Sequence, residues 1–253
     1  MTADETTAIR QQAFTLVELS IVLVIIGLVV GGVLVGQGAV RASMLQKLIT
    51  DKVMFETSFY AFQTKYGCIA GDCSNATDFF GTSTDCGNAM CKDLTASGGT
   101  CNGGNGNGII ESTASSYPNI YEALLLWNQL GLSGLIAGKY FGSYCGITSN
   151  NVPVSPLNNK SIWWGNTGVV VAGKTVFTVG KPTGQAWGAS ITASNAYSID
   201  SKIDDGNPNG GRFRAREGYK PDQSGFYPDG CKSGNVYDVN QTEERCLISF
   251  VIR

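Results

Sequence analysis

The chain contains no histidine, which excludes Ser-His-Asp and Cys-His catalysis, histidine metal ligands and histidine pH switches. Charged residues are also scarce, at 15% against about 25% in ordinary globular proteins. The 18 basic and 20 acidic side chains give a net charge of −2, so the basic excess of a nucleic-acid binder is missing. We therefore do not expect nucleic acid as a partner. Apolar residues, at 43%, suffice for a core and exclude a wholly disordered chain.

One segment lacks charge altogether, from residue 19 to residue 40. The apolar run of residues 14–35 is long enough to span a bilayer, because about 20 helical residues cover its core of about 30 Å. It is too long for a secretory signal peptide, and no clear small-residue cleavage site follows it. Glu18 lies inside this run, where a deeply placed carboxylate costs about 2.5–3.5 kcal/mol. An acid at such a position indicates a function and calls for a partner.

The residues around Glu18, Ala13-Phe14-Thr15-Leu16-Val17-Glu18 and the apolar run after them, resemble the N-terminus of type IV prepilins and type II secretion pseudopilins. The resemblance implies that prepilin peptidase cuts between Ala13 and Phe14 and methylates the new amine of Phe14. The chain departs from the family at Ala13, where Gly is usual, and its leader has Arg10 as its single basic side chain. The alternative is a plain signal anchor that is never cut.

The resemblance also implies partners and a role for Glu18. In a filament, Glu18 would pair with the Phe14 amine of a neighbouring subunit, and each charge would make the other tolerable away from water. The partners implied are copies of the chain or other pilins, prepilin peptidase, an assembly platform and the membrane. The alternative is that Glu18 merely reaches the membrane interface.

The helix is expected to continue beyond the membrane to Tyr66, with Gly67 as its C-cap. Apolar residues recur there at steps of three, four or seven, and no proline interrupts residues 14–66. This stripe, expected to bury against the head and to pack subunits, consists of Val40, Met44, Leu48, Phe55, Phe59, Phe62 and Tyr66.

Short elements are predicted in the rest of the chain. They are a helix over 120–130, a hairpin over 161–171 turning at 165–168, a strand at 174–179, a helix over 193–203 and a final, central strand at 247–252. With the resemblance, they predict an α+β, pilin-like fold: a long N-terminal membrane-spanning helix packed on a small antiparallel sheet with disulfide-rich loops. The expected parts are a leader (1–13), a transmembrane half-helix (14–38), an amphipathic half-helix (39–66) and a head (67–253). Trp163 and Trp164 are expected in the core.

All eight cysteines lie between Cys68 and Cys246, which suits an oxidising compartment and places the head in the periplasm or at the cell surface. Spacing alone does not determine their pairing. The resemblance implies a C-terminal disulfide loop closed by Cys231 and Cys246. The remaining candidates are local pairs Cys68–Cys73 and Cys86–Cys91, then Cys101 and Cys145. A four-cysteine zinc site is the alternative.

Two segments are candidate calcium sites, and no other cofactor is expected. Asn102, Asn105 and Asn107 alternate with glycines as in a calcium loop, although amides replace the usual carboxylates. The alternative is a plain Asn/Gly turn. Asp204 and Asp205, with Asp200 before them, form an acidic cluster that is otherwise a helix end running into a turn.

Arg212-Phe213-Arg214-Ala215-Arg216 interleaves basic and apolar residues and is interpreted as a solvated strand or loop, with nucleic-acid binding as the alternative. No catalytic constellation is present, so the chain is not expected to be an enzyme. The sequence favours a pilin-like structural subunit, held in the bacterial inner membrane before assembly and in a filament afterwards. The alternatives are a type II secretion pseudopilin and a membrane-anchored periplasmic binding protein that never polymerises.

Overall fold

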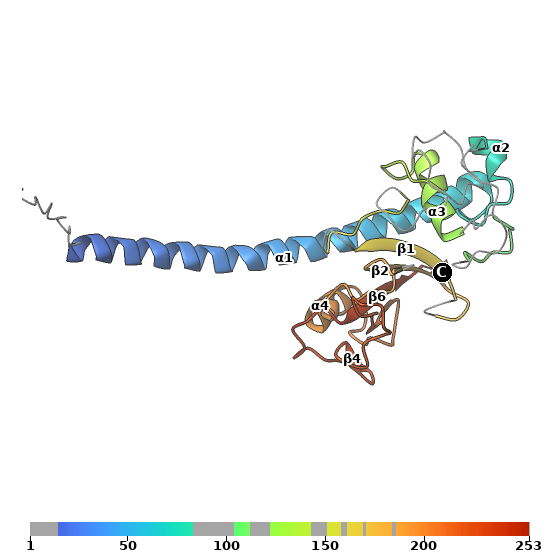
Figure 1. The fold of residues 1–253 in the computed structure, drawn as a ribbon. Coiled ribbons are helices and arrows are strands. Elements are labelled where there is room, and N and C mark those ends of the chain that lie inside the picture. The colour runs from blue at the N-terminus through green and yellow to red at the C-terminus, as the bar shows by residue number, and fades with distance from the viewer. Residues whose placement is uncertain are drawn as a thin grey trace, which may run out of the picture. The chain divides into compact units, whose positions relative to one another are not determined.

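The computed structural model describes residues 15–82, 104–111, 122–142, 151–157, 161–168, 171–183 and 186–252. The chain falls into two compact units, Met1–Ser43 and Met44–Arg253. Figure 1 traces the order of the elements along the chain. Helix α1 (Leu16–Tyr66) supplies all the described secondary structure of the first unit and continues into the second.

A four-stranded antiparallel sheet forms the centre of the second unit. Its strands are β1 (Ile162–Thr167), β2 (Thr175–Gly180), β3 (Phe213–Glu217) and β6 (Cys246–Val251), in the order β1-β2-β6-β3. The last strand is therefore central, as the sequence predicted. A separate two-stranded ribbon joins β4 (Lys232–Ser233) to β5 (Val236–Tyr237).

Three shorter helices complete the described part of the head: α2 (Ala76–Phe80), α3 (Glu122–Leu132) and α4 (Ala193–Ile203). The two longer ones match the predicted helices. Thr192 caps α4, since its side chain accepts a hydrogen bond from the Asn195 N–H. Nine consecutive residues of α3, from Glu122 to Leu130, are buried, so this helix lies inside the head rather than on its surface.

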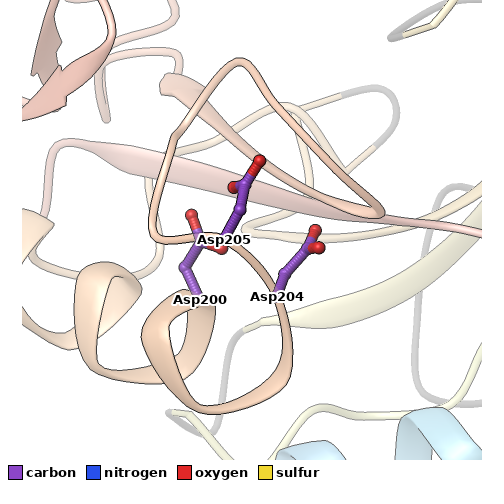
Figure 2. Close-up of side chains that lie close together, drawn as sticks. All are labelled: Asp200, Asp204 and Asp205. Atoms are coloured by element: carbon purple, nitrogen blue, oxygen red, sulfur yellow. The ribbon is translucent and has the colours of Figure 1, made fainter.

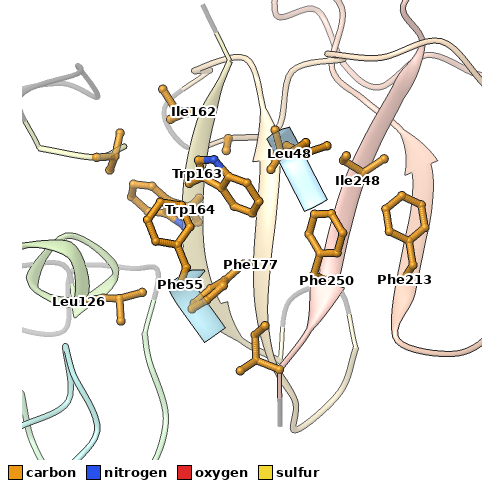
Figure 3. Packing of buried hydrophobic residues seen from close by; sticks show 14 of the residues in the cluster. Leu48, Phe55, Leu126, Ile162, Trp163, Trp164, Phe177, Phe213, Ile248 and Phe250 are labelled. Carbon is orange, nitrogen blue, oxygen red and sulfur yellow. The ribbon is translucent and has the colours of Figure 1, made fainter. Parts of the chain in front are cut away.

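One aromatic residue from each strand lines the face of the sheet toward the core. Trp163, Phe177, Phe250 and Phe213 come from β1, β2, β6 and β3, and Figure 3 shows them across the sheet. Phe55 of α1 packs edge-on against Trp163 and against Trp127 of α3, with ring centres 5.2 and 5.0 Å apart. The structure thus confirms the α+β architecture, a long helix packed on a small antiparallel sheet.

The predicted apolar stripe of α1 is correct only in part. Leu48, Phe59 and Phe62 are fully buried, but Val40 and Met44 are 55% and 40% exposed. Leu45 takes the buried position instead. The prediction was wrong at this end because sequence periodicity does not show where the head stops covering the helix.

The predicted hairpin turn at residues 165–168 is also wrong. Strand β1 runs through Gly165 and Asn166, and the chain reverses between Gly168 and Lys174. A Cβ atom at Gly165 would collide with Leu126 of α3 and would contact the Phe177 ring. The glycine therefore permits close helix–sheet packing and does not mark a turn.

Candidate functional site

Glu18 lies in the first turn of α1, and its carboxylate is bound by Thr15. Glu18 Oε2 accepts hydrogen bonds from the Thr15 N–H and the Thr15 hydroxyl, both at 2.8 Å. The Thr15 hydroxyl oxygen in turn accepts a 3.2 Å hydrogen bond from the Glu18 N–H. This reciprocal pattern is a capping box, and the spacing Thr-x-x-Glu is its sequence signal. Ala13 and Phe14, the predicted cleavage and methylation residues, lie outside the described residues.

The part of α1 that directly follows Glu18, up to Val35, exposes its described large apolar side chains. The side chains of Leu19, Leu23 and Val29 are each more than half exposed. Helix α1 is long and apolar enough to cross a membrane. Such a surface is unfavourable in water, since each buried methylene is worth about 0.8 kcal/mol, so it requires lipid or other apolar helices around it.

A family model described as the prokaryotic N-terminal methylation motif matches residues 9–34. The chain carries the prepilin signature. This match includes Ala13, Phe14 and Glu18 together with most of the apolar run. No curated protein and no solved structure matches the chain.

The prepilin motif, which covers residues 9–34, supports a pilin- or pseudopilin-type protein that is processed by prepilin peptidase, and such a protein is structural rather than catalytic. The motif and the apolar helix together fit anchoring in a membrane.

The described residues of the head include two disulfides, and both pairs match the sequence-based candidates. Cys231 is bonded to Cys246, and Cys68 to Cys73. The first bond ties the short ribbon to the central strand β6 and closes the last loop of the chain. The other four candidates, Cys86, Cys91, Cys101 and Cys145, lie outside the described residues.

The described part of the Asn/Gly segment, residues 104–111, wraps around a carboxylate. Asp72 accepts hydrogen bonds from the backbone N–H groups of Gly106 and Gly108, each at 2.7 Å, and of Asn107 at 3.2 Å. The side-chain oxygens of Asn105 and Asn107 accept from backbone N–H groups two residues further on. The loop therefore directs donors at an anion, whereas a calcium site needs converging oxygens. Asn102 lies outside the described residues.

Glu122, the first residue of α3, fixes the same loop from its other side. Its carboxylate oxygens accept from the Glu111 N–H at 2.8 Å and the Asn105 N–H at 3.2 Å. Burial, and then the neighbouring charges of Asp72 and Glu111, raise the pKa of Glu122 to about 7, although the two N–H donors oppose that rise. The protonation state of this carboxyl group therefore changes near neutral pH.

Three carboxylates gather where α4 ends, as Figure 2 shows for Asp200, Asp204 and Asp205. One oxygen of each lies within 4.8 Å of the others. Asp200 is buried and accepts a 2.6 Å hydrogen bond from the Tyr237 hydroxyl. Burial raises the pKa of Asp200, and the charges of Asp205 and Asp204 add to the rise.

The acidic cluster meets only part of what calcium requires. Calcium takes six to eight oxygen ligands, roughly, and these carboxylates supply hard oxygens of the right kind. However, Asp204 Oδ2 already accepts from the backbone N–H groups of Arg212 and Phe213, and Asp205 Oδ1 accepts from Asn207. Calcium at Asp204 and Asp205 stays a prediction.

Sequence reasoning missed two functional features. The Thr15–Glu18 capping box had a readable signal, a threonine three residues before a glutamate at the start of an apolar run. The role of Asp72 had none, because residues 72 and 106 meet only in the folded head.

Proposed function

We propose that the chain is a structural subunit that assembles, after prepilin peptidase processing, into a type IV pilus or a related filament. The observation that supports this proposal is the joint presence of the methylation motif and a long exposed apolar helix with one acid near its start. A plain anchor needs the apolar helix but has no need of the acid or of the motif.

Glu18 supplies the assembly contact in this proposal. Before processing, its carboxylate is satisfied by Thr15 of the same chain. After the cut at Ala13–Phe14, the amine of Phe14 on a neighbouring subunit would offer a full positive charge in place of neutral donors. The attraction between two opposite full charges at low dielectric exceeds that between a carboxylate and neutral donors, so the exchange favours the filament over the isolated subunit.

The remaining partners follow from the same proposal. The subunit would wait in the bacterial inner membrane with its head in the periplasm, meet the assembly platform there, and enter a filament in the periplasm or at the cell surface. A type II secretion pseudopilin would use the same residues, and the size of the filament that forms separates the two. Whether the subunit is a major or a minor one follows from its share of that filament.

The test compares Glu18→Ala with Thr15→Ala in cells that express the peptidase and an assembly system. Loss of a buried charge partner costs about 3–5 kcal/mol, so Glu18→Ala should lower incorporation by more than about tenfold. Thr15→Ala removes the cap but keeps the carboxylate and should incorporate almost normally. The measurement is the amount of each variant in sheared filaments, normalised to total chain.

Other outcomes point to other functions. Equal incorporation of both variants would mean that Glu18 is only a helix cap. A mature chain that still begins at Met1 by intact mass, with the peptidase present, would support a plain membrane anchor. A processed chain that forms no filament with either type of system would support a membrane-anchored binding protein.

A further inference from the structure

Two arginines of strand β3, Arg214 and Arg216, are less exposed than the arginines of a solvated strand would be. Phe213 and Ala215 are buried in the core, at 0% and 2% exposure. Because successive side chains of a strand point to opposite faces, Arg214 and Arg216 share the other face, roughly 6–7 Å apart along the strand. Both side chains are partly buried.

The guanidinium group of Arg216 lies against two aromatic rings. Its central carbon is 4.8 Å from the centre of the Trp187 ring and 5.3 Å from that of Phe226. Trp187 and Phe226 are themselves in edge-to-face contact, with centres 6.5 Å apart. Cation–π contacts of this kind offset part of the cost of burying the charge.

Each arginine has one buried nitrogen without a hydrogen-bond partner among the described residues. Nε of Arg216 and Nη1 of Arg214 are buried and make no hydrogen bond, and no ion pair joins either residue to an acid in the described part of the chain. The nearby charge of Glu217 favours the charged form of Arg216, but its carboxylate accepts from the Lys232 N–H. Burial lowers the pKa of Arg216, yet an arginine stays charged at any physiological pH.

Arg245, in the same head, also contacts an aromatic ring but has acidic hydrogen-bond partners. Its guanidinium lies over the Tyr227 ring at 4.4 Å. It also donates to Glu243 at 3.2 and 2.9 Å and reaches Asp229 at 3.4 Å. Aromatic stacking is thus common to Arg245 and Arg216, and the acidic partner is what Arg216 lacks.

We propose that Arg216, with Arg214 beside it on β3, forms a binding site for an oxyanion next to Trp187 and Phe226. The ligand is a carboxylate or a phosphate group, since both offer two oxygens in the spacing of a guanidinium edge. The two rings contact the guanidinium of Arg216, and no acid of the described residues forms an ion pair with it. An oxyanion would satisfy donors whose burial without a partner is otherwise costly. This site does not depend on filament assembly.

Trp187 supplies a reporter for the site in the full-length chain in neutral detergent. Trp127, Trp163 and Trp164 are at most 1% exposed, so quenchers in water reach Trp187 first. Quenching by iodide, an anion, is compared with quenching by neutral acrylamide. Phosphate and acetate are then titrated separately at an ionic strength held constant with sodium chloride. We expect iodide quenching to fall at least about twofold in a saturable way, while acrylamide quenching changes less.

Variants assign the effect to Arg216. Arg216→Gln should remove the saturable response, Arg216→Lys should weaken it several-fold because lysine has no bidentate edge, and Arg245→Gln is the matched control that should keep it. A response to phosphate alone identifies a phosphate ligand, and one to acetate alone a carboxylate. If Arg216→Gln does not fold, as judged by near-UV circular dichroism, Arg214→Gln replaces it. No saturable competition in the unmodified chain, or equal loss in Arg245→Gln, would overturn the proposal.

Discussion

In the N-terminal unit Leu23, Ile25 and Val29 are more than half exposed, whereas in the second unit Phe59 and Phe62 of the same helix are fully buried. The residues are apolar in both units, and the helix is continuous between them. The surroundings of the helix differ, because in the second unit the sheet covers the apolar stripe of α1. The N-terminal unit has only a surface that lipid or other subunits must cover. Folding of the head and placement of the anchor are therefore separate problems.

The largest expected effect tests this separation directly. Phe59→Ala should destabilise the head by about 3–5 kcal/mol, because it empties a fully buried site. Ile25→Ala, its matched control in the exposed unit, should change head stability by less than about 0.5 kcal/mol. The measurement is denaturant unfolding of the full chain in detergent, followed by near-UV circular dichroism. A large effect of Ile25→Ala would mean that the two units are coupled.

The two described disulfides should contribute different amounts to the unfolding free energy of the head. Replacing Cys231 and Cys246 by serine opens a loop of 15 residues and should cost about 3 kcal/mol of unfolding free energy. Replacing Cys68 and Cys73, 5 residues apart, should cost about 2 kcal/mol. Both double variants are compared by the same denaturant unfolding. The reverse order would show that loop length does not set the cost of losing each bond.

Glu122 should make head stability depend on pH. Its pKa is about 7 in the folded head against 4.5 in the unfolded chain. The folded state therefore binds this proton more tightly than the unfolded chain does. The stability that the proton contributes to the head is fully present below pH 4.5 and is lost as the pH rises through about 7. We expect a loss of about 2–3 kcal/mol, because Glu122 is buried and each unit of its pKa shift is worth about 1.4 kcal/mol.

Glu122→Gln should flatten this pH profile between pH 4.5 and 7, as measured by thermal unfolding at several pH values. Asp222→Asn is the control, since Asp222 is exposed and its pKa is lowered by hydrogen bonds from Ser224. An unchanged slope in Glu122→Gln would assign the pH dependence to another group, with Asp200 the next candidate because burial raises its pKa too.

The smallest expected effect concerns calcium at Asp204 and Asp205. Ligand at ten times its dissociation constant stabilises a protein by about 1.4 kcal/mol, so millimolar calcium should raise the unfolding temperature by a few degrees. Asp205→Asn should remove that rise, whereas Asn107→Ala in the Asn/Gly loop should keep it. Equal unfolding temperatures in calcium and in a chelator would show this prediction to be wrong.

The parts of the fold that the sequence predicted are those governed by local pattern. Helix α4, with its Thr192 cap, and the apolar strand β6 follow from periodicity and capping within a few residues. Gly165 misled the prediction because the same residue type serves turns and close contacts, and only Leu126, brought near by folding, distinguishes them. The candidate site divides in the same way: Thr15 and Glu18 are neighbours in sequence, whereas Arg216 and Trp187 meet only through the fold.

The sequence by itself supplied the prepilin signature, because a cleavage and methylation motif, an apolar segment and a capping box each consist of neighbouring residues and need no folded context. Only the tertiary structure decided which polar groups are satisfied. Asp72 gained three backbone donors from a loop more than 30 residues away, while Arg216 contacts two rings and forms no ion pair within the described residues. Burial gives a charge its energetic consequence, and burial depends on packing between residues that are distant along the chain.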